Sequence, residues 1–113
     1  MSEFTRESRP AHLKPIDADV WPGIAVVPQP GRLRTKRAEA GFARACAAAG
    51  LSLSGDEPDI TVERAEVFPR IAAGGWVGLA EGYMAGEWST TSSQQLVDAL
   101  TALLRAGYRP RTP

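Results

Sequence analysis

Residues 75–88 read GWVGLAEGYMAGEW, and the rest of the chain is organised around them. The stretch holds two of the three tryptophans and one of the two tyrosines, with glycines spaced between them. Glycine lets a second backbone approach closely, and large rings need a surface on which to lie. We therefore expect a tightly packed segment that carries aromatic side chains. Glu81 lies among these rings, and a carboxylate in apolar company needs a partner.

The chain has 113 residues, which suffices for one domain and not for two separate cores. Its 13 basic and 13 acidic residues cancel, which argues against a general nucleic-acid binder. The single cysteine, Cys46, excludes an internal disulfide and a thiolate metal cluster. No apolar run approaches the ~20 residues that span a bilayer, and the polar N-terminus is unlike a signal peptide. We expect a soluble, cytoplasmic protein without a transmembrane segment, able to lie at the membrane periphery.

The two ends of the chain are predicted to be tails around one domain, residues 20–107. Residues 1–19 mix charge and proline and indicate a mobile tail, whereas residues 108–113 indicate a short polar one. Prolines interrupt and end the apolar segment 20–28, so that we expect neither a long helix nor a central strand there. Its anchors would be Trp21 and Val26. The segment either lies extended on the domain or docks on a partner chain, and the sequence leaves both open.

Two helices have clear boundaries in the sequence. Apolar residues recur at helical spacing from about Leu33 to Ala49, and Gly50 follows as a glycine that ends a helix. The second helix begins after Ser92, which with Gln95 fits a capping box, and it carries a leucine-rich stripe.

Shorter elements lie between these helices. Residues 51–54 alternate and residues 60–62 are β-branched, which predicts a hairpin across the turn at 55–59. Two further short helices are expected over residues 65–73 and 78–85. The fold class is therefore α+β, a small and mostly helical domain with a short β-hairpin.

The central stretch resembles a motif of the cyclopropane-fatty-acyl-phospholipid synthases, in their N-terminal domain. The residues that carry the resemblance are Gly78, Glu81, Tyr83, Met84, Gly86 and Trp88. Ala80 and Gly82 depart from the family pattern, both as changes between small residues. The order of the expected elements also follows that domain from about Trp21 to Gly107.

The resemblance implies a role in lipid chemistry without catalysis by these residues. That family consists of S-adenosylmethionine-dependent enzymes, and its cofactor loop belongs to a methyltransferase domain that this sequence does not contain. We expect a non-catalytic accessory subunit of a separately encoded fatty-acyl or phospholipid methyltransferase, with no cofactor of its own. Lipid or the partner would meet five side chains, while Gly78 and Gly86 shape the backbone. Those five are Trp76, Glu81, Tyr83, Met84 and Trp88.

Other interpretations remain open at this level. The chain could instead be an independent lipid- or fatty-acid-binding module, or a self-associating structural domain. Tyr83 and Met84 suit an acyl groove, but ordinary core positions are the favoured explanation for both. For Glu81, an internal hydrogen bond is slightly favoured over a ligand contact. An enzyme is the least favoured interpretation. The only histidine, His12, lies in a predicted tail, and the sequence offers no nucleophile with a base and no set of metal ligands.

Overall fold

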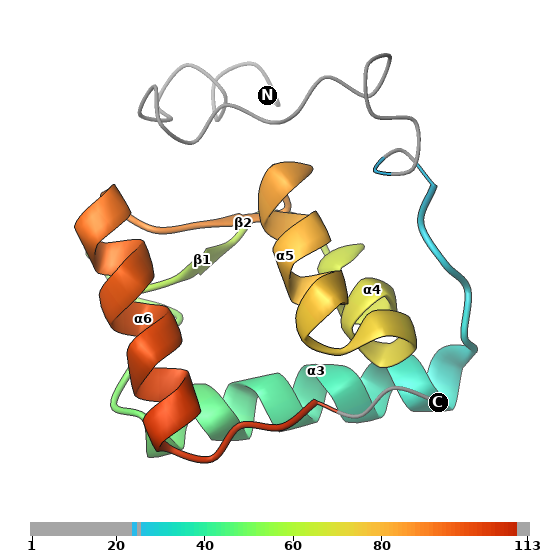
Figure 1. Cartoon of the computed structure of the whole chain (residues 1–113), viewed down its shortest axis with the longest axis horizontal. Helices are drawn as coiled ribbons and strands as arrows, with labels where there is room; N and C mark the ends of the chain where they lie inside the picture. The colour runs from blue at the N-terminus through green and yellow to red at the C-terminus, as the bar shows by residue number, and fades with distance from the viewer. Residues whose placement is uncertain (1–23, 25, 111–113) are drawn as a thin grey trace.

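The computed structural model describes residue 24 and residues 26–110 (Figure 1). Four helices and two short strands occupy this part of the chain, in a domain with a Cα radius of gyration of 13.5 Å. In chain order, with the labels of Figure 1, they are α3 (Arg32–Ala48), β1 (Thr61–Val62), α4 (Val67–Gly74), α5 (Trp76–Met84), β2 (Trp88–Ser89) and α6 (Ser93–Arg105). The expected α+β class is confirmed.

Helix α3 lies along one side of the domain, and α6 and the α4–α5 pair stand on it at opposite ends (Figure 1). Phe42 and Cys46 are its buried residues, one helical turn apart. Gly50 follows with φ of 75°, a conformation that a residue with a Cβ rarely adopts. The predicted helix and its terminating glycine are confirmed within one residue.

Helix α6 begins where its capping residue predicts. The backbone N–H of Gln95 donates to Oγ of Ser92 at 3.0 Å, which satisfies one of the free N–H groups of the first turn. The Gln95 side chain reaches Asp59 instead of the Ser92 backbone, so that one half of the capping box forms. Ala99 and Leu103 turn inward, and both are fully buried.

The strands pair differently from the predicted hairpin. β1 pairs antiparallel with β2, which joins Thr61 to Ser89 and Val62 to Trp88. Residues 51–54, predicted as the first strand, form no strand and lead into an exposed loop. There the carboxylate of Asp59 accepts hydrogen bonds from the backbone and hydroxyl of Ser52, and this local closure replaces a β-ladder.

Helices α4 and α5 pack with almost no space between their backbones. Gly75 joins them with φ of 57°. A Cβ at Gly78 would overlap the backbone carbonyl of Arg70, and one at Gly82 would lie 2.7 Å from Cγ2 of Val67. These two glycines are one helical turn apart, so α5 presents a side-chain-free strip to α4. Glycines 78 and 82 therefore set the distance between the two helices.

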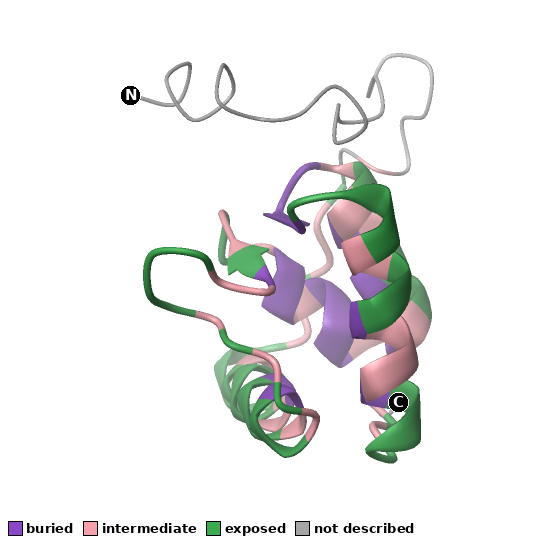
Figure 2. Cartoon of the chain, turned by 90° about the vertical axis from the view of Figure 1, so that its left-hand side faces the viewer, coloured by how far each residue is buried: buried purple, intermediate pink, exposed green. Residues whose placement is uncertain are grey.

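A single core lies between the helices, seen as the central purple region of Figure 2. Every described helix contributes to it, and β2 contributes Trp88, which is 2% exposed. The fully or nearly buried apolar residues are Phe42, Cys46, Ile60, Val67, Phe68, Ile71, Leu79, Trp88, Ala99 and Leu103.

The predicted start of the domain at residue 20 lies outside the described residues, as do residues 1–19 and Trp21. Val26 is 70% exposed, so it does not anchor its segment on the domain. Tyr108 packs edge-on against Phe42 and Trp76, with ring centroids 6.0 and 5.3 Å apart. The packed chain therefore continues past Gly107, because the tyrosine ring is apolar enough to join the core edge.

The α4–α5 contact predicts a contrast between two glycine-to-alanine variants. Gly78→Ala should lower the free energy of unfolding by about 3 kcal/mol or more, because the backbone of Arg70 cannot yield to a methyl group. Gly41→Ala in α3 should raise it by up to about 1 kcal/mol, because a Cβ there meets nothing within 4 Å. Urea unfolding of both variants measures the difference. Equal stability of the two would show that the helices do not pack in this way.

Candidate functional site: an apolar groove between α5 and α6

A groove of about 440 Å³ runs between α5 and α6. No charged residue lines it, and its only side-chain polar groups are the indole N–H groups and the tyrosine hydroxyl. The lining residues are Trp76, Leu79, Ala80, Tyr83, Met84, Trp88, Leu96, Leu100 and Leu104. The groove thus brings together four of the five predicted contact residues, and Glu81 is the one that it leaves out.

One wall comes from α5, at positions spaced by three and four residues. Trp76, Ala80, Tyr83 and Met84 fall on one helix face. Trp76 and Tyr83 are half-buried, Ala80 is exposed and Met84 is 36% exposed. The small side chain of Ala80 keeps this wall low between the larger residues, so the groove remains open to solvent.

The other wall comes from the leucines of α6. Leu96, Leu100 and Leu104 are spaced by four residues, and Leu104 is 59% exposed. The core side of the same helix uses Ala99 and Leu103. Leu96 and Leu100 are half-buried and also pack against the core, so the apolar face of α6 is shared between the core and the groove.

The floor is formed by Trp88 and Leu79. The Trp88 indole donates to the backbone carbonyl of Leu79 at 2.8 Å, and the Tyr83 ring meets it edge-on at 5.1 Å. A ring with its N–H satisfied and 2% of its surface exposed is a fixed part of the core. Trp88 thus supports the groove from below, while Trp76, Tyr83 and Met84 are accessible from outside.

A buried ion pair holds the segment that ends in Trp88. The Arg70 Nε donates to both carboxylate oxygens of Glu87 at 2.9 Å, and the two residues are 2% and 3% exposed. Nη2 of Arg70 also donates to the backbone carbonyl of Ile24, which lies before α3. Arg70 therefore holds that segment as well as Glu87. Burial raises the pKa of Glu87, whereas the hydrogen bond and charge of Arg70 act in the opposite direction.

Sequence reasoning missed this pair and placed the carboxylate that needs a partner at Glu81. Glu81 is half-buried on α5 and lies outside the groove lining, whereas Glu87 is the enclosed one. One signal for Arg70 was its place in the otherwise apolar run VFPRIAAG. The sequence signal for Glu87 was its position between a glycine and a tryptophan, Gly86 and Trp88. In the structure Gly86 has φ of 79° and Trp88 is buried.

Other kinds of site are not found in the described residues. Residue 24 and residues 26–110 contain no group of three or more His, Cys, Asp or Glu placed to hold a metal ion. Within the same residues, no helix combines the length and the apolar character that crossing a bilayer requires. Of the acidic loop residues, Asp56 and Glu57 are exposed, and Asp59 is half-buried and used in the loop contact with Ser52.

Comparisons with models of protein families, with curated proteins and with solved structures found no match to this chain.

The two carboxylates should respond differently to removal of their charge. Glu87→Gln leaves the guanidinium of Arg70 buried without a counter-charge and should lower the free energy of unfolding by about 3–5 kcal/mol. Glu81→Gln should change it by less than about 0.5 kcal/mol, because Glu81 is only half-buried and the amide keeps its contact with water. Chemical denaturation followed by circular dichroism makes the comparison. A larger loss for Glu81→Gln would reverse the assignment of the structural carboxylate.

Proposed function

We propose that the groove between α5 and α6 binds the hydrocarbon chain of a fatty acid or phospholipid. The chain would do so as a non-catalytic accessory subunit of a separately encoded S-adenosylmethionine-dependent acyl methyltransferase. Lipid binding is supported by the groove, and the association with a methyltransferase by the sequence resemblance of residues 75–88.

The observation that carries the proposal is the uncharged, open lining of the groove. A pocket of about 300–1,000 Å³ with mainly apolar walls is typical of small-molecule sites, and this groove of about 440 Å³ falls in that range. A methylene chain asks only for apolar contact along its length, since it has no hydrogen-bonding groups to satisfy. Met84 suits such a ligand because its unbranched thioether adapts to irregular apolar shapes.

The exposed positions around the groove support binding over a purely structural role. Met84 and Leu104, which line the groove from α5 and α6, remain 36% and 59% exposed. Apolar residues that gather in one surface region favour an interaction site over chance exposure. Burying them under an acyl chain would gain about 25 cal/mol for each Å² removed from water.

Two glutamate variants on α6 test lipid binding. Leu104→Glu should weaken the affinity for oleate at least tenfold, because the carboxylate would have to lose its water beside the hydrocarbon chain. Val97→Glu is the matched control, since Val97 is similarly exposed on the same helix and does not line the groove. Its affinity should stay within twofold of the unaltered chain. Titration below the critical micelle concentration, followed by tryptophan emission, gives both values.

The fluorescence signal must come from the groove for that test to count. In a chain that also carries Trp21→Phe, Trp76→Phe should remove most of the emission change on oleate addition, because the remaining Trp88 is enclosed in the core. No emission change with the unaltered chain, together with no binding by calorimetry, would contradict the lipid-binding proposal. Equal weakening by Leu104→Glu and Val97→Glu would place the ligand elsewhere.

The accessory role has a separate test. The tagged chain should co-purify with an acyl methyltransferase from its native host, and adding the chain should raise that enzyme's turnover on unsaturated phospholipid. Leu104→Glu should lose the stimulation, and Val97→Glu should keep it. Oleate binding without any effect on a methyltransferase would leave an independent lipid-binding module as the function.

A further inference from the structure

A second hollow, of about 710 Å³, lies between α3 and the segment that follows α6. One wall is α3, and the other is formed by the backbone and side chains of residues 106–110. Four arginines line it and no acidic residue does. The full lining is Arg34, Arg37, Ala38, Gly41, Arg44, Ala45, Ile71, Ala72, Ala106, Gly107, Tyr108, Arg109 and Pro110.

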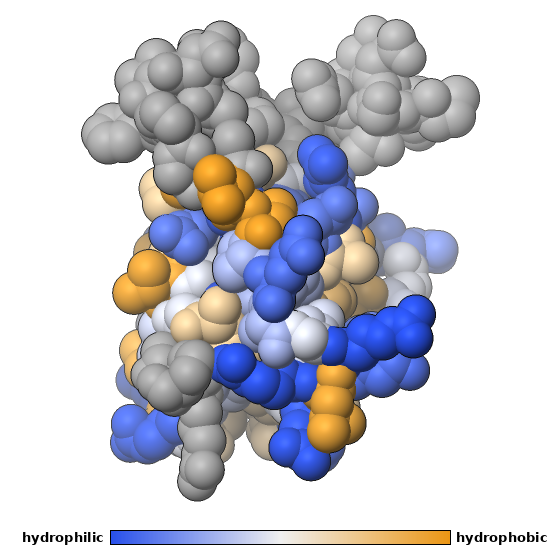
Figure 3. Space-filling view, turned by 90° about the vertical axis from the view of Figure 1, so that its right-hand side faces the viewer, coloured by the Kyte–Doolittle hydropathy of each residue, from blue (hydrophilic) through white to orange (hydrophobic). Residues whose placement is uncertain are grey.

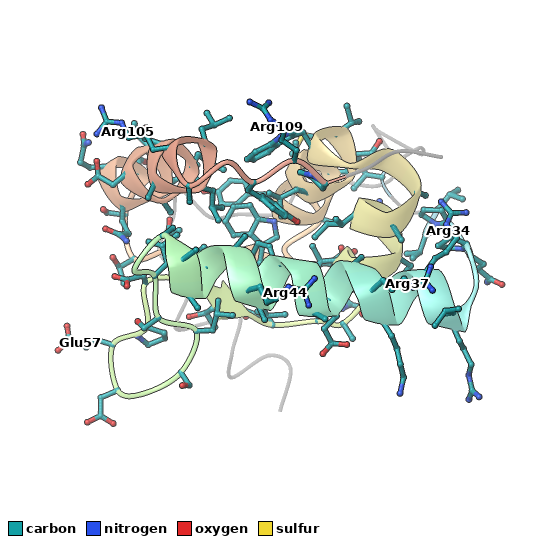
Figure 4. The ribbon with its side chains drawn as sticks, turned by 90° about the horizontal axis from the view of Figure 1, so that it is seen from below. Arg34, Arg37, Arg44, Glu57, Arg105 and Arg109 are labelled. Carbon is teal, nitrogen blue, oxygen red and sulfur yellow. The ribbon has the colours of Figure 1, made fainter. Side chains whose placement is uncertain are left out.

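The arginines of α3 share one helix face with a gap at its centre. Arg34, Arg37 and Arg44 are three and seven residues apart, and Gly41 occupies the same face between the last two. A Cβ at Gly41 would meet nothing within 4 Å, so the middle of this face is open space. Figure 4 shows these three side chains along α3 and Arg109 on the segment after α6. The hollow is thus open at Gly41, and arginine residues line it both from α3 and from the segment after α6.

The positive charges of the hollow are not neutralised by the described part of the protein. Arg34 donates from Nη2 to the carbonyl of Ala72 at 2.9 Å, a bond that orients the side chain and leaves its charge. Among residue 24 and residues 26–110, the ion pairs are Arg64 with Glu66 and Arg70 with Glu87, and neither involves the hollow. The end of the domain where α3 begins shows many hydrophilic residues with hydrophobic ones between them (Figure 3). Because the whole chain has no net charge, the excess of positive charge at the hollow is a local feature.

We infer that this hollow binds a phosphate ester group. A guanidinium offers a planar fork of donors that matches phosphate oxygens, and several around one anion make charge-assisted hydrogen bonds. The ring of Tyr108 lines the hollow and packs against Trp76 at 5.3 Å, and Trp76 in turn lines the apolar groove. An aromatic pair therefore separates the phosphate site from the acyl groove. The phosphate is that of a lipid headgroup or of a soluble phosphate ester, and the site does not depend on the groove being occupied.

Binding of the full chain to two probes distinguishes these sources. The first is sedimentation with phosphatidylglycerol vesicles, compared with phosphatidylcholine vesicles, and the second is calorimetry with glycerol 3-phosphate. Binding to the anionic vesicles alone assigns a lipid headgroup, and binding to glycerol 3-phosphate assigns a soluble ester. Binding to neither probe overturns the inference.

Paired charge variants show whether the hollow is responsible. Arg37→Gln with Arg44→Gln should weaken binding at least tenfold, and the remaining affinity should depend less on salt. Lys36→Gln with Arg105→Gln makes the same change in net charge at exposed positions outside the hollow. That control should stay within threefold of the unaltered chain. Equal losses in both double variants would mean a diffuse charge effect and would contradict a phosphate site. Circular dichroism confirms folding, which these exposed positions should not disturb.

Discussion

The contact between Gly78 and the backbone of Arg70 is the constraint on which the rest of the domain depends. It allows α5 to lie directly on α4, since no side chain separates them at this point. The side chain of the same arginine holds Glu87 and reaches the carbonyl of Ile24. One residue thus fixes two helices, the start of β2 and the segment before α3. Arrangements that separate Arg70 from Glu87 are disfavoured, because a buried charge without its partner is strongly destabilising.

This arrangement divides the aromatic stretch into an inner and an outer part. Trp88 is enclosed with its N–H bonded, and it forms a rigid base. Trp76, Tyr83 and Met84 rest on that base with surface left open. The groove is therefore preformed, and a ligand would not need to order its walls, which lowers the cost of binding. Packing against the core explains the apolar face of α6 only in part, because Leu104 lines the groove and is 59% exposed.

Local signals in the sequence were sufficient for the elements that they define. The boundaries of α3 and α6 follow from Gly50 and from the Ser92 cap, each of which acts within one turn of helix. The strand pair was mispredicted because residues 61–62 join residues 88–89 across two intervening helices, and no local pattern encodes that pairing. Four groove residues could be named from the aromatic stretch 75–88, whereas the leucines of α6 could not be assigned to the groove without the packing of the helices. The ion pair was missed because charged residues are expected at the surface, and only the fold shows that Glu87 and not Glu81 is enclosed.

The central claim is that the open side of the α5–α6 groove receives a hydrocarbon chain. The most direct test is methyl NMR of the full chain, with isotope-labelled Met and Leu methyl groups and deuterated background, in the presence of protonated oleate. The account predicts intermolecular nuclear Overhauser effects from the oleate methylene protons to Met84, Leu100 and Leu104. Effects confined to methyl groups outside the groove, such as that of the exposed Leu33 on α3, or no effects at saturating oleate, would contradict it.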